Sequence, residues 1–192
     1  MCKNLKIIPF LILFTYCFDR PLTIKVAPIF SDGMVLQRNT MVNIWGTASP
    51  NTDIQILSEW GQKLSIKSND TGAWKAKLLS PNEGGPFFLK INSNKESFII
   101  RDILVGEVWL ASGQSNMEMS LMGYPPIDTI LNYKKEIREA NYPFIRMFNV
   151  EKQFSIYPAK DFKGSWLKAS PSQIEKFSAT AYFFARELHK KL

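Results

Sequence analysis

The residue in this sequence with the clearest capacity for chemistry is Ser115. It lies in a glycine-containing segment, residues 112–117 (SGQSNM), directly after the apolar run 105–111. A serine in a tight turn after a buried strand projects its hydroxyl from the carboxyl end of a sheet, where open α/β folds bind ligands. Its backbone N–H can then help to stabilise an oxyanion. Taken alone, the short pattern Gly-x-Ser favours the alternative, a plain loop whose Ser115 and Asn116 bond their own backbone.

The composition excludes several other kinds of site. The chain has 192 residues, 45% of them hydrophobic and 13% aromatic, which is enough for a core and argues against disorder. It contains one histidine and two cysteines, both within the first seventeen residues, which excludes a histidine-rich metal site and a disulfide scaffold. The net charge is +7, but its lysines and arginines are scattered among acids. We therefore expect no nucleic-acid partner.

The first twenty residues resemble an export signal. Lys3 and Lys6 precede a short apolar stretch, residues 7–18. This is the order of a secretory signal peptide, and the stretch is too short for a stable membrane span, which needs about 20 apolar residues. We expect residues 1–20 to be a signal peptide and the protein to be secreted or periplasmic. Lipoprotein anchoring at Cys17 is the less favoured alternative, because Tyr16 is bulky for such a site.

Residues 21–103 have the pattern of a small antiparallel β-sandwich. Short apolar or alternating runs are separated by turn residues, as in all-β domains. Alternation is clearest at residues 53–56 and 63–67, where one face is apolar and the other polar. The expected strands are residues 23–26, 34–37, 41–46, 53–57, 63–67, 73–78, 87–92 and 97–101.

Residues 104–192 change character, from a strand to helices. We expect a buried strand at 105–111, a helix over 127–140, and a longer helix after Ser170. Ser170, Pro171 and Gln173 have the spacing of a capping box with proline at the first helical position. A strand, a serine-bearing turn and then helices are typical of the opening of an α/β domain.

Two weaker signals remain open. Residues 69–71 (NDT) fit a glycosylation acceptor, but the same residues form ordinary turns, which we favour. Tryptophans can stack on sugars, yet Trp45 and Trp109 lie in apolar runs and are expected in the core, whereas Trp60, next to a glycine, is a better candidate for exposure.

A comparison over a longer stretch of the sequence indicates a function for the serine segment. Residues 105–118 (VGEVWLASGQSNME) strongly resemble the nucleophile block of the sialate O-acetylesterase family, which belongs to the SGNH (GDSL-like) hydrolases. Residues 27–38, 42–46, 72–78, 84–87, 145–148, 164–166 and 177–188 also resemble that family. The likeness covers nearly everything after residue 20, and it implies that residues 104–192 are the N-terminal part of an SGNH-type α/β hydrolase domain.

The resemblance implies a serine-dependent removal of O-acetyl groups from sialic acid or related acetylated glycans. Ser115 is then the nucleophile, and its backbone N–H is one oxyanion donor. Gly113, Gln114 and Asn116 match the motif and are expected to shape the turn and the pocket without a chemical step. This chemistry needs no cofactor or metal.

The family's remaining functional blocks are absent from these 192 residues. They are a glycine and an asparagine that donate to the oxyanion and an Asp-x-x-His pair that activates the serine. The one histidine, His189, has Arg186 in the place of that aspartate, and we interpret it as a helix-end cation. We therefore expect the chain alone to be a poor esterase. The alternatives are a non-catalytic glycan-binding β-sandwich with a vestigial hydrolase tail, or an acetylxylan esterase.

Overall fold

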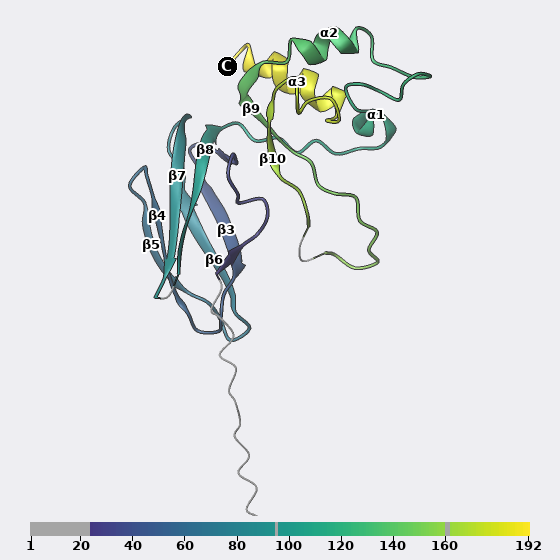
Figure 1. Ribbon diagram of the computed structural model, residues 1–192. Coiled ribbons are helices and arrows are strands. Elements are labelled where there is room, and N and C mark those ends of the chain that lie inside the picture. Colours follow the sequence, from purple (N-terminus) through teal and green to yellow (C-terminus); the bar gives the residue numbers. More distant parts are fainter. Residues whose placement is uncertain (1–23, 95, 160–161) are drawn as a thin grey trace, which may run out of the picture.

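The chain is mostly β-strand with few helices (Figure 1). The structure, a computed structural model, describes residues 24–94, 96–159 and 162–192. The expected signal peptide, residues 1–20, and Cys17 lie outside this range. In the described chain, no helix is both long and apolar enough to cross a membrane. The first eight strands are β1 Lys25–Val26, β2 Val35–Gln37, β3 Met41–Thr47, β4 Asp53–Ser58, β5 Lys63–Lys67, β6 Ala73–Leu79, β7 Gly84–Ser93 and β8 Ser97–Gly106.

These eight strands form two sheets, with the orders β1-β3-β6 and β2-β8-β7-β4-β5. All eight expected strands are found, although β7 and β8 are longer than predicted. The expectation of a purely antiparallel arrangement is wrong at one pair: β2 runs parallel to β8, with Val35 opposite Leu104 and Gln37 opposite Gly106. This pairing places the end of β2 beside the residues that lead to Ser115.

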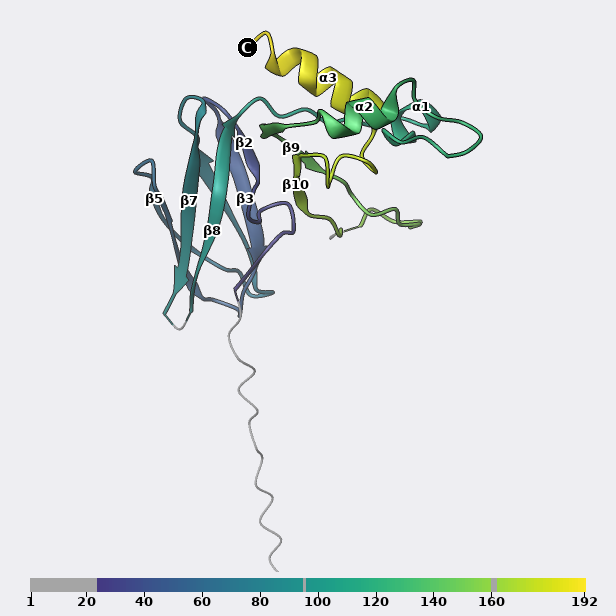
Figure 2. The same cartoon turned by 45° about the horizontal axis from the view of Figure 1, so that its top comes forward.

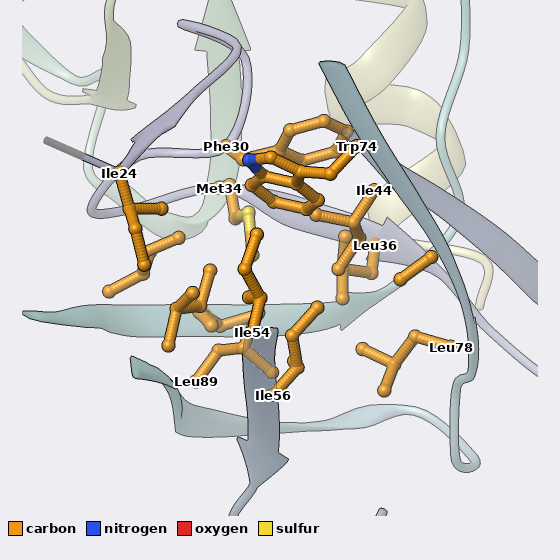
Figure 3. Packing of buried hydrophobic residues seen from close by; sticks show 14 of the residues in the cluster. Ile24, Phe30, Met34, Leu36, Ile44, Ile54, Ile56, Trp74, Leu78 and Leu89 are labelled. Atoms are coloured by element: carbon orange, nitrogen blue, oxygen red, sulfur yellow. The ribbon is translucent and has the colours of Figure 1, made fainter. Parts of the chain in front are cut away.

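One hydrophobic cluster lies between the two sheets (Figure 3). Alternate residues of β4 and β6 point into it, so that Ile54, Ile56 and Leu78 are fully buried while their neighbours face water. This is the alternation that the sequence shows at residues 53–56. Trp74 and Met34 fill the centre of the cluster.

The turn at Asn69–Gly72 illustrates how the hairpins close. The Asn69 side-chain oxygen accepts hydrogen bonds from the backbone N–H and the hydroxyl of Thr71 and from the N–H of Ala73. Gly72 follows with a φ of 82°, a conformation that favours glycine. The turn expected at 69–71 is thus confirmed.

After β8 the chain departs from the expected strand. Only Val105 and Gly106 of the run 105–111 belong to a strand, and the next residues have no regular structure. The apolar side chains of this run are exposed, with Trp109 at 61% and Leu110 at 94%. The burial predicted for Trp109 is therefore wrong, because in the described chain no neighbouring strand pairs with or covers this segment. Trp45 is also partly exposed, and it packs edge-on against Phe30.

A second, smaller cluster contains the helices and a hairpin that the sequence did not predict. The hairpin pairs β9 Tyr142–Phe148 with β10 Trp166–Ala169. The helices are α1 Ser115–Glu118, α2 Tyr133–Arg138 and α3 Ala179–His189. In Figures 1 and 2 they lie with the hairpin beyond the end of β8, beside the sheets. The buried residues of the cluster are Leu121, Ala140, Ile145, Met147, Ala169, Ile174, Ala179 and Tyr182.

Two helix predictions need correction. The helix expected over 127–140 is confined to α2, and the residues before it form turns. The last helix begins at Ala179 instead of after Ser170. The side chain of Gln173 accepts from the N–H of Lys168, across the turn, so the capping box does not form. Ser178 caps α3 instead, because its hydroxyl accepts from the N–H of Ala181.

The hairpin is attached to the first two sheets at a kink in β8. Asp102 has a φ of 56°, which turns its carboxylate toward β9. Both its oxygens accept from Arg146, at 2.8 and 3.0 Å, and Lys168 lies 3.1 Å away. The indole N–H of Trp166 donates to the carbonyl of Ile29 at 2.7 Å. Arg101 and Asp102 are both part of the continuous strand β8.

Candidate functional site

Ser115 is the first residue of the short helix α1, and its side chain is exposed. Residues 107–113, of which 108–113 are exposed, lead to it from the end of β8. The sequence predicts a serine presented by a turn after a strand. The structure retains the turn and the exposure, while the strand ends several residues earlier.

The residues next to Ser115 in the segment 112–117 form the turn itself. The carbonyl of Gln114 accepts from the N–H groups of Met117 and Glu118, both at 2.9 Å. A Cβ on Gly113 would lie 3.0 Å from the Cβ of Met117, so a larger residue there would push the turn apart. These contacts fit the expected role of Gly113 and Gln114 in shaping the turn. The backbone N–H of Ser115 bonds no residue in the described chain and is free to donate to a ligand.

The N-terminus of α3 holds α1 in place. The Thr180 hydroxyl donates to the carbonyl of Asn116 at 2.9 Å, and the N–H of Ala179 donates to the carbonyl of Met119 at 2.9 Å. The Ser178 hydroxyl also approaches the sulfur of Met117. Asn116 thus contributes its carbonyl to the support of the serine turn.

Sequence reasoning missed Thr180 and Ser178 as supports of this turn. A serine followed by an apolar helical run is a helix-start signal that would have pointed to residue 178. Nothing in the spacing of Thr180 indicates its contact with Asn116, which depends on the tertiary fold.

The charged pair nearest the serine is Glu118 with Lys152. The two side chains form a hydrogen-bonded ion pair on the surface. The Glu118 carboxylate raises the pKa of the Lys152 ammonium group, chiefly through this hydrogen bond. The Glu118 carboxylate is thus engaged by Lys152, and the described chain shows no hydrogen bond between it and the Ser115 hydroxyl.

His189 is not placed to activate Ser115. It lies at the C-terminal end of α3, edge-on to Tyr142, whereas α1 contacts the N-terminal end of the same helix. Ten residues of helix separate the two ends, or about 15 Å. The described chain also holds no group of three or more His, Cys, Asp or Glu residues that could bind a metal ion.

Two surface hollows of the described chain lie away from the serine. One is lined by residues 129–135 and Arg138, and a smaller one by Asp53, Gln55 and residues 92–94. Neither of these two includes Ser115, whose side chain is exposed.

Comparison with known proteins identifies a consistent set of relatives. No family model matches the chain. Sialate O-acetylesterase of Rattus norvegicus is 27% identical over 187 residues, covering 88% of this chain and 33% of its own length. The human sialate O-acetylesterase is 28% identical over 191 residues, covering 88% of this chain and 35% of its own.

A solved structure supports the same relationship. A carbohydrate acetylesterase of Xanthomonas citri superposes with a TM-score of 0.81 and 34% sequence identity. It matches 88% of this chain, and the match covers 38% of that protein. The chain therefore resembles the sialate O-acetylesterases, as its sequence predicts, and spans about a third of the length of these curated relatives.

Proposed function

We propose that this chain carries the nucleophile of a carbohydrate O-acetylesterase, and that the nucleophile is Ser115. The observation that supports this most strongly is the exposed Ser115 on a braced turn, within a chain related over 88% of its length to acetylesterases. In this proposal the two sheets of residues 24–106 are a β-sandwich. Residues 104–192 are the opening of an SGNH-type α/β domain, whose serine segment the sandwich supports.

The proposed reaction is acyl transfer in two steps. The Ser115 oxygen attacks the carbonyl carbon of an acetyl ester, while a base takes the serine proton and the free N–H of Ser115 stabilises the oxyanion. The bond to the sugar oxygen then breaks, and that oxygen takes the proton, which leaves an acetyl-serine. Water attacks this second ester and releases acetate, which regenerates the hydroxyl.

The base is the missing component. A serine hydroxyl without a base is a weak nucleophile at neutral pH. In the described residues the only imidazole, that of His189, lies at the wrong end of α3. We therefore expect the 192-residue chain alone to hydrolyse acetyl esters no faster than its Ser115→Ala variant.

The substrate class follows from the relatives. The matched proteins are named for sialic acid or carbohydrate esters, and we propose acetylated sialic acid or a related acetylated glycan for this chain. Acetylated xylan is the alternative. Such substrates suit the secreted or periplasmic location expected from residues 1–20.

The test begins by reading the coding sequence beyond Leu192. The 192-residue chain and any longer polypeptide are then assayed for acetate release from O-acetylated sialic acid and from acetylated xylan. In a longer, active polypeptide, Ser115→Ala should lower kcat/KM by about 10³-fold or more. Ser112→Ala, at another exposed serine of the same segment, is the matched control and should stay near the wild-type rate.

Full turnover by Ser115→Ala would refute the assignment of the nucleophile. If the frame ends at Leu192 and the chain binds the glycan without turnover, even after deletion of residues 107–192, it is a binding module and the enzyme proposal fails.

A further inference from the structure

The chain from β8 to Ser115 is held by hydrogen bonds at its two ends, and between them the Trp109 ring packs edge-on against Phe184 of α3, with 5.2 Å between the ring centroids. The backbone groups of residues 109–113 make no hydrogen bond within the described chain, and the side chains of Trp109 and Leu110 are largely exposed. The far end is fixed where α3 holds α1 through Asn116 and Met119. The near end, at Glu107 and Val108, must be fixed by something else.

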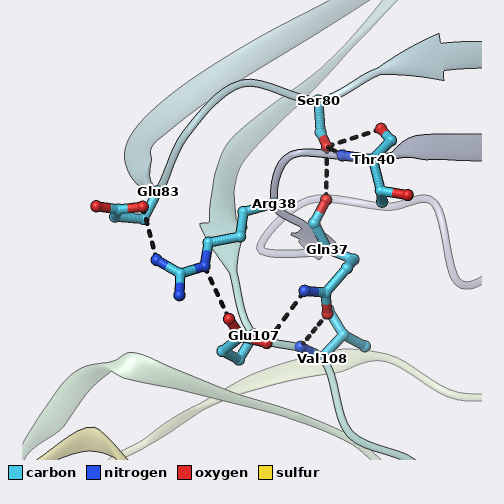
Figure 4. A network of polar contacts seen from close by, with 7 residues as sticks. All are labelled: Gln37, Arg38, Thr40, Ser80, Glu83, Glu107 and Val108. Carbon is cyan, nitrogen blue, oxygen red and sulfur yellow. Dashed lines mark hydrogen bonds and ion pairs between the residues drawn. The ribbon is translucent and has the colours of Figure 1, made fainter. Parts of the chain in front are cut away.

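Gln37 binds this near end of the segment through both the nitrogen and the oxygen of its side-chain amide (Figure 4). Its Nε2 donates to Glu107 Oε2 at 3.1 Å, and its Oε1 accepts from the backbone N–H of Val108 at 2.9 Å. A single side chain thus binds two consecutive residues, one through its carboxylate and one through its backbone. This arrangement fixes both the position and the direction of the chain as it leaves the sheet.

Arg38 holds the other oxygen of the same carboxylate. Its Nε donates to Glu107 Oε1 at 2.8 Å, and its Nη1 donates to Glu83 Oε2, also at 2.8 Å. Hydrogen bonds from Gln37 and then Arg38 lower the pKa of Glu107, so the carboxylate is ionised at neutral pH. Charge-assisted hydrogen bonds of this kind are stronger than neutral ones.

The backbone of Gln37 is itself well anchored. Its carbonyl accepts from the hydroxyl of Ser80 at 2.6 Å, and that hydroxyl in turn accepts from the N–H of Thr40 at 3.1 Å. Ser80 is only 3% exposed. Gln37 is also opposite Gly106 in the parallel pair of β2 and β8. The support for Glu107 and Val108 is therefore part of the sheet.

We propose that Gln37 and Arg38 are positioning residues for Ser115. They fix the starting point of the serine segment on the β-sheets, while Thr180 and Ala179 fix its end. The chemical importance of this placement rests on the proposed role of Ser115, but the placement can be measured without turnover. It also assigns the two sheets a task in the reaction: they set the position from which the nucleophile is presented.

The first readout is amide exchange at Val108. In Gln37→Ala the N–H loses its acceptor, and its exchange should accelerate by about tenfold or more, since a lost hydrogen bond to a side chain changes opening equilibria on that scale. Gln55→Ala, at an exposed glutamine of β4, is the matched control and should leave Val108 unchanged.

The second readout is the distance between spin labels on the sheet and on the serine turn. Labels are attached in Ser65→Cys, on the exposed face of β5, and Ser115→Cys, with Cys2 and Cys17 replaced by serine. Gln37→Ala should broaden the distance distribution, and Gln55→Ala should not. Circular dichroism of each variant shows whether the sheets remain folded.

A double substitution separates positioning from general damage. Gln37→Glu alone sets two carboxylates against each other and should broaden the distribution. Gln37→Glu with Glu107→Gln exchanges donor and acceptor between the two side chains, so their hydrogen bond re-forms while residue 37 still accepts from the N–H of Val108, and the distribution should narrow again. A Gln37→Ala distribution as narrow as the wild type, or a double variant as broad as Gln37→Glu alone, would overturn the inference. Neither result bears on Ser115 as nucleophile, which the Ser115→Ala assay tests separately.

Discussion

The ion pair of Asp102 with Arg146 offers the most direct test of how the hairpin is held against the sheets. The substitution is Asp102→Asn. Asparagine tolerates the left-handed φ of 56° at this position, so the backbone strain stays the same and the charge is removed. The Arg146 guanidinium is only 4% exposed and would lose its anionic partner, while Lys168 would lose its ion pair.

The magnitude follows from the pKa of the carboxylate. Hydrogen bonds from Arg146 lower the pKa of Asp102 from 3.8 to about 2. That fall corresponds to about 2.4 kcal/mol of folding free energy at 1.36 kcal/mol per pKa unit. Since 34% of the Asp102 side chain is exposed, screening by solvent reduces the figure to about 1–2 kcal/mol.

The pH dependence has a definite sign. A carboxylate with a lowered pKa in the folded state stabilises the fold above its unfolded pKa, near 3.8, and the stabilisation disappears as the pH falls through about 2. Urea unfolding followed by circular dichroism, at several pH values between 7 and 2, measures this directly. Asp102→Asn should be less stable than the wild type by about 1–2 kcal/mol at pH 7, and most of this difference should be gone near pH 2.

Asp128→Asn, at an exposed residue of a loop, is the control and should leave the free energy of unfolding at pH 7 unchanged. A difference between wild type and Asp102→Asn below about 0.3 kcal/mol at pH 7, or one that persists unchanged at pH 2, would refute the reasoning.

Three further outcomes follow from packing. Met34→Ala, at a side chain with no exposed surface in the centre of the first cluster, should lower the free energy of unfolding by about 2–5 kcal/mol in urea titrations. Gly46→Ala places a Cβ 1.9 Å from the carbonyl oxygen of Lys25 and should cost about 2 kcal/mol or more, whereas Gly106→Ala, with open space around it, should be nearly neutral; equal effects at the two glycines would contradict the geometry. Leu110→Gln, at a side chain that is 94% exposed, should leave the free energy of unfolding unchanged, and a loss above about 0.5 kcal/mol would contradict this exposure.

The sequence predicts the strands of residues 24–106 well, because each strand is recognisable from its own local residue pattern. Alternation at residues 53–56 and 63–67, and turn residues such as Asn69 and Gly72, depend on local chemistry alone. The parallel pairing of β2 with β8 has no such local signal, because it joins residues about seventy positions apart.

The later part is predicted less well, since its elements depend on tertiary contacts. The run 105–111 is apolar enough for a buried strand, but a strand needs partners for its backbone, and the described chain provides none. The residues from Ser170 to Gln173 have the types and spacing of a helix start. The Gln173 side chain, however, accepts from the N–H of Lys168 and does not cap a helix.

The candidate site likewise has one part that the sequence predicts and one part that depends on tertiary contacts. The position and exposure of Ser115 follow from the residues around it, whereas the chemistry proposed for it rests on the resemblance to acetylesterases. The residues that hold its segment, Gln37 and Thr180, lie about seventy residues on either side. Their ordinary side chains acquire a role only when the fold brings them beside Glu107 and Asn116.

The order of residues in the first cluster has a consequence for how the protein is made. Every fully enclosed side chain of that cluster lies between Ile24 and Val105, whereas Arg146 and Trp166, which attach the hairpin, come later in the chain. During synthesis the two sheets can therefore close before the ribosome has released the residues that dock onto them. The serine-bearing segment and the hairpin then pack onto β-sheets that have already folded. On stalled nascent chains, the N-terminal half is therefore expected to become protease-resistant first.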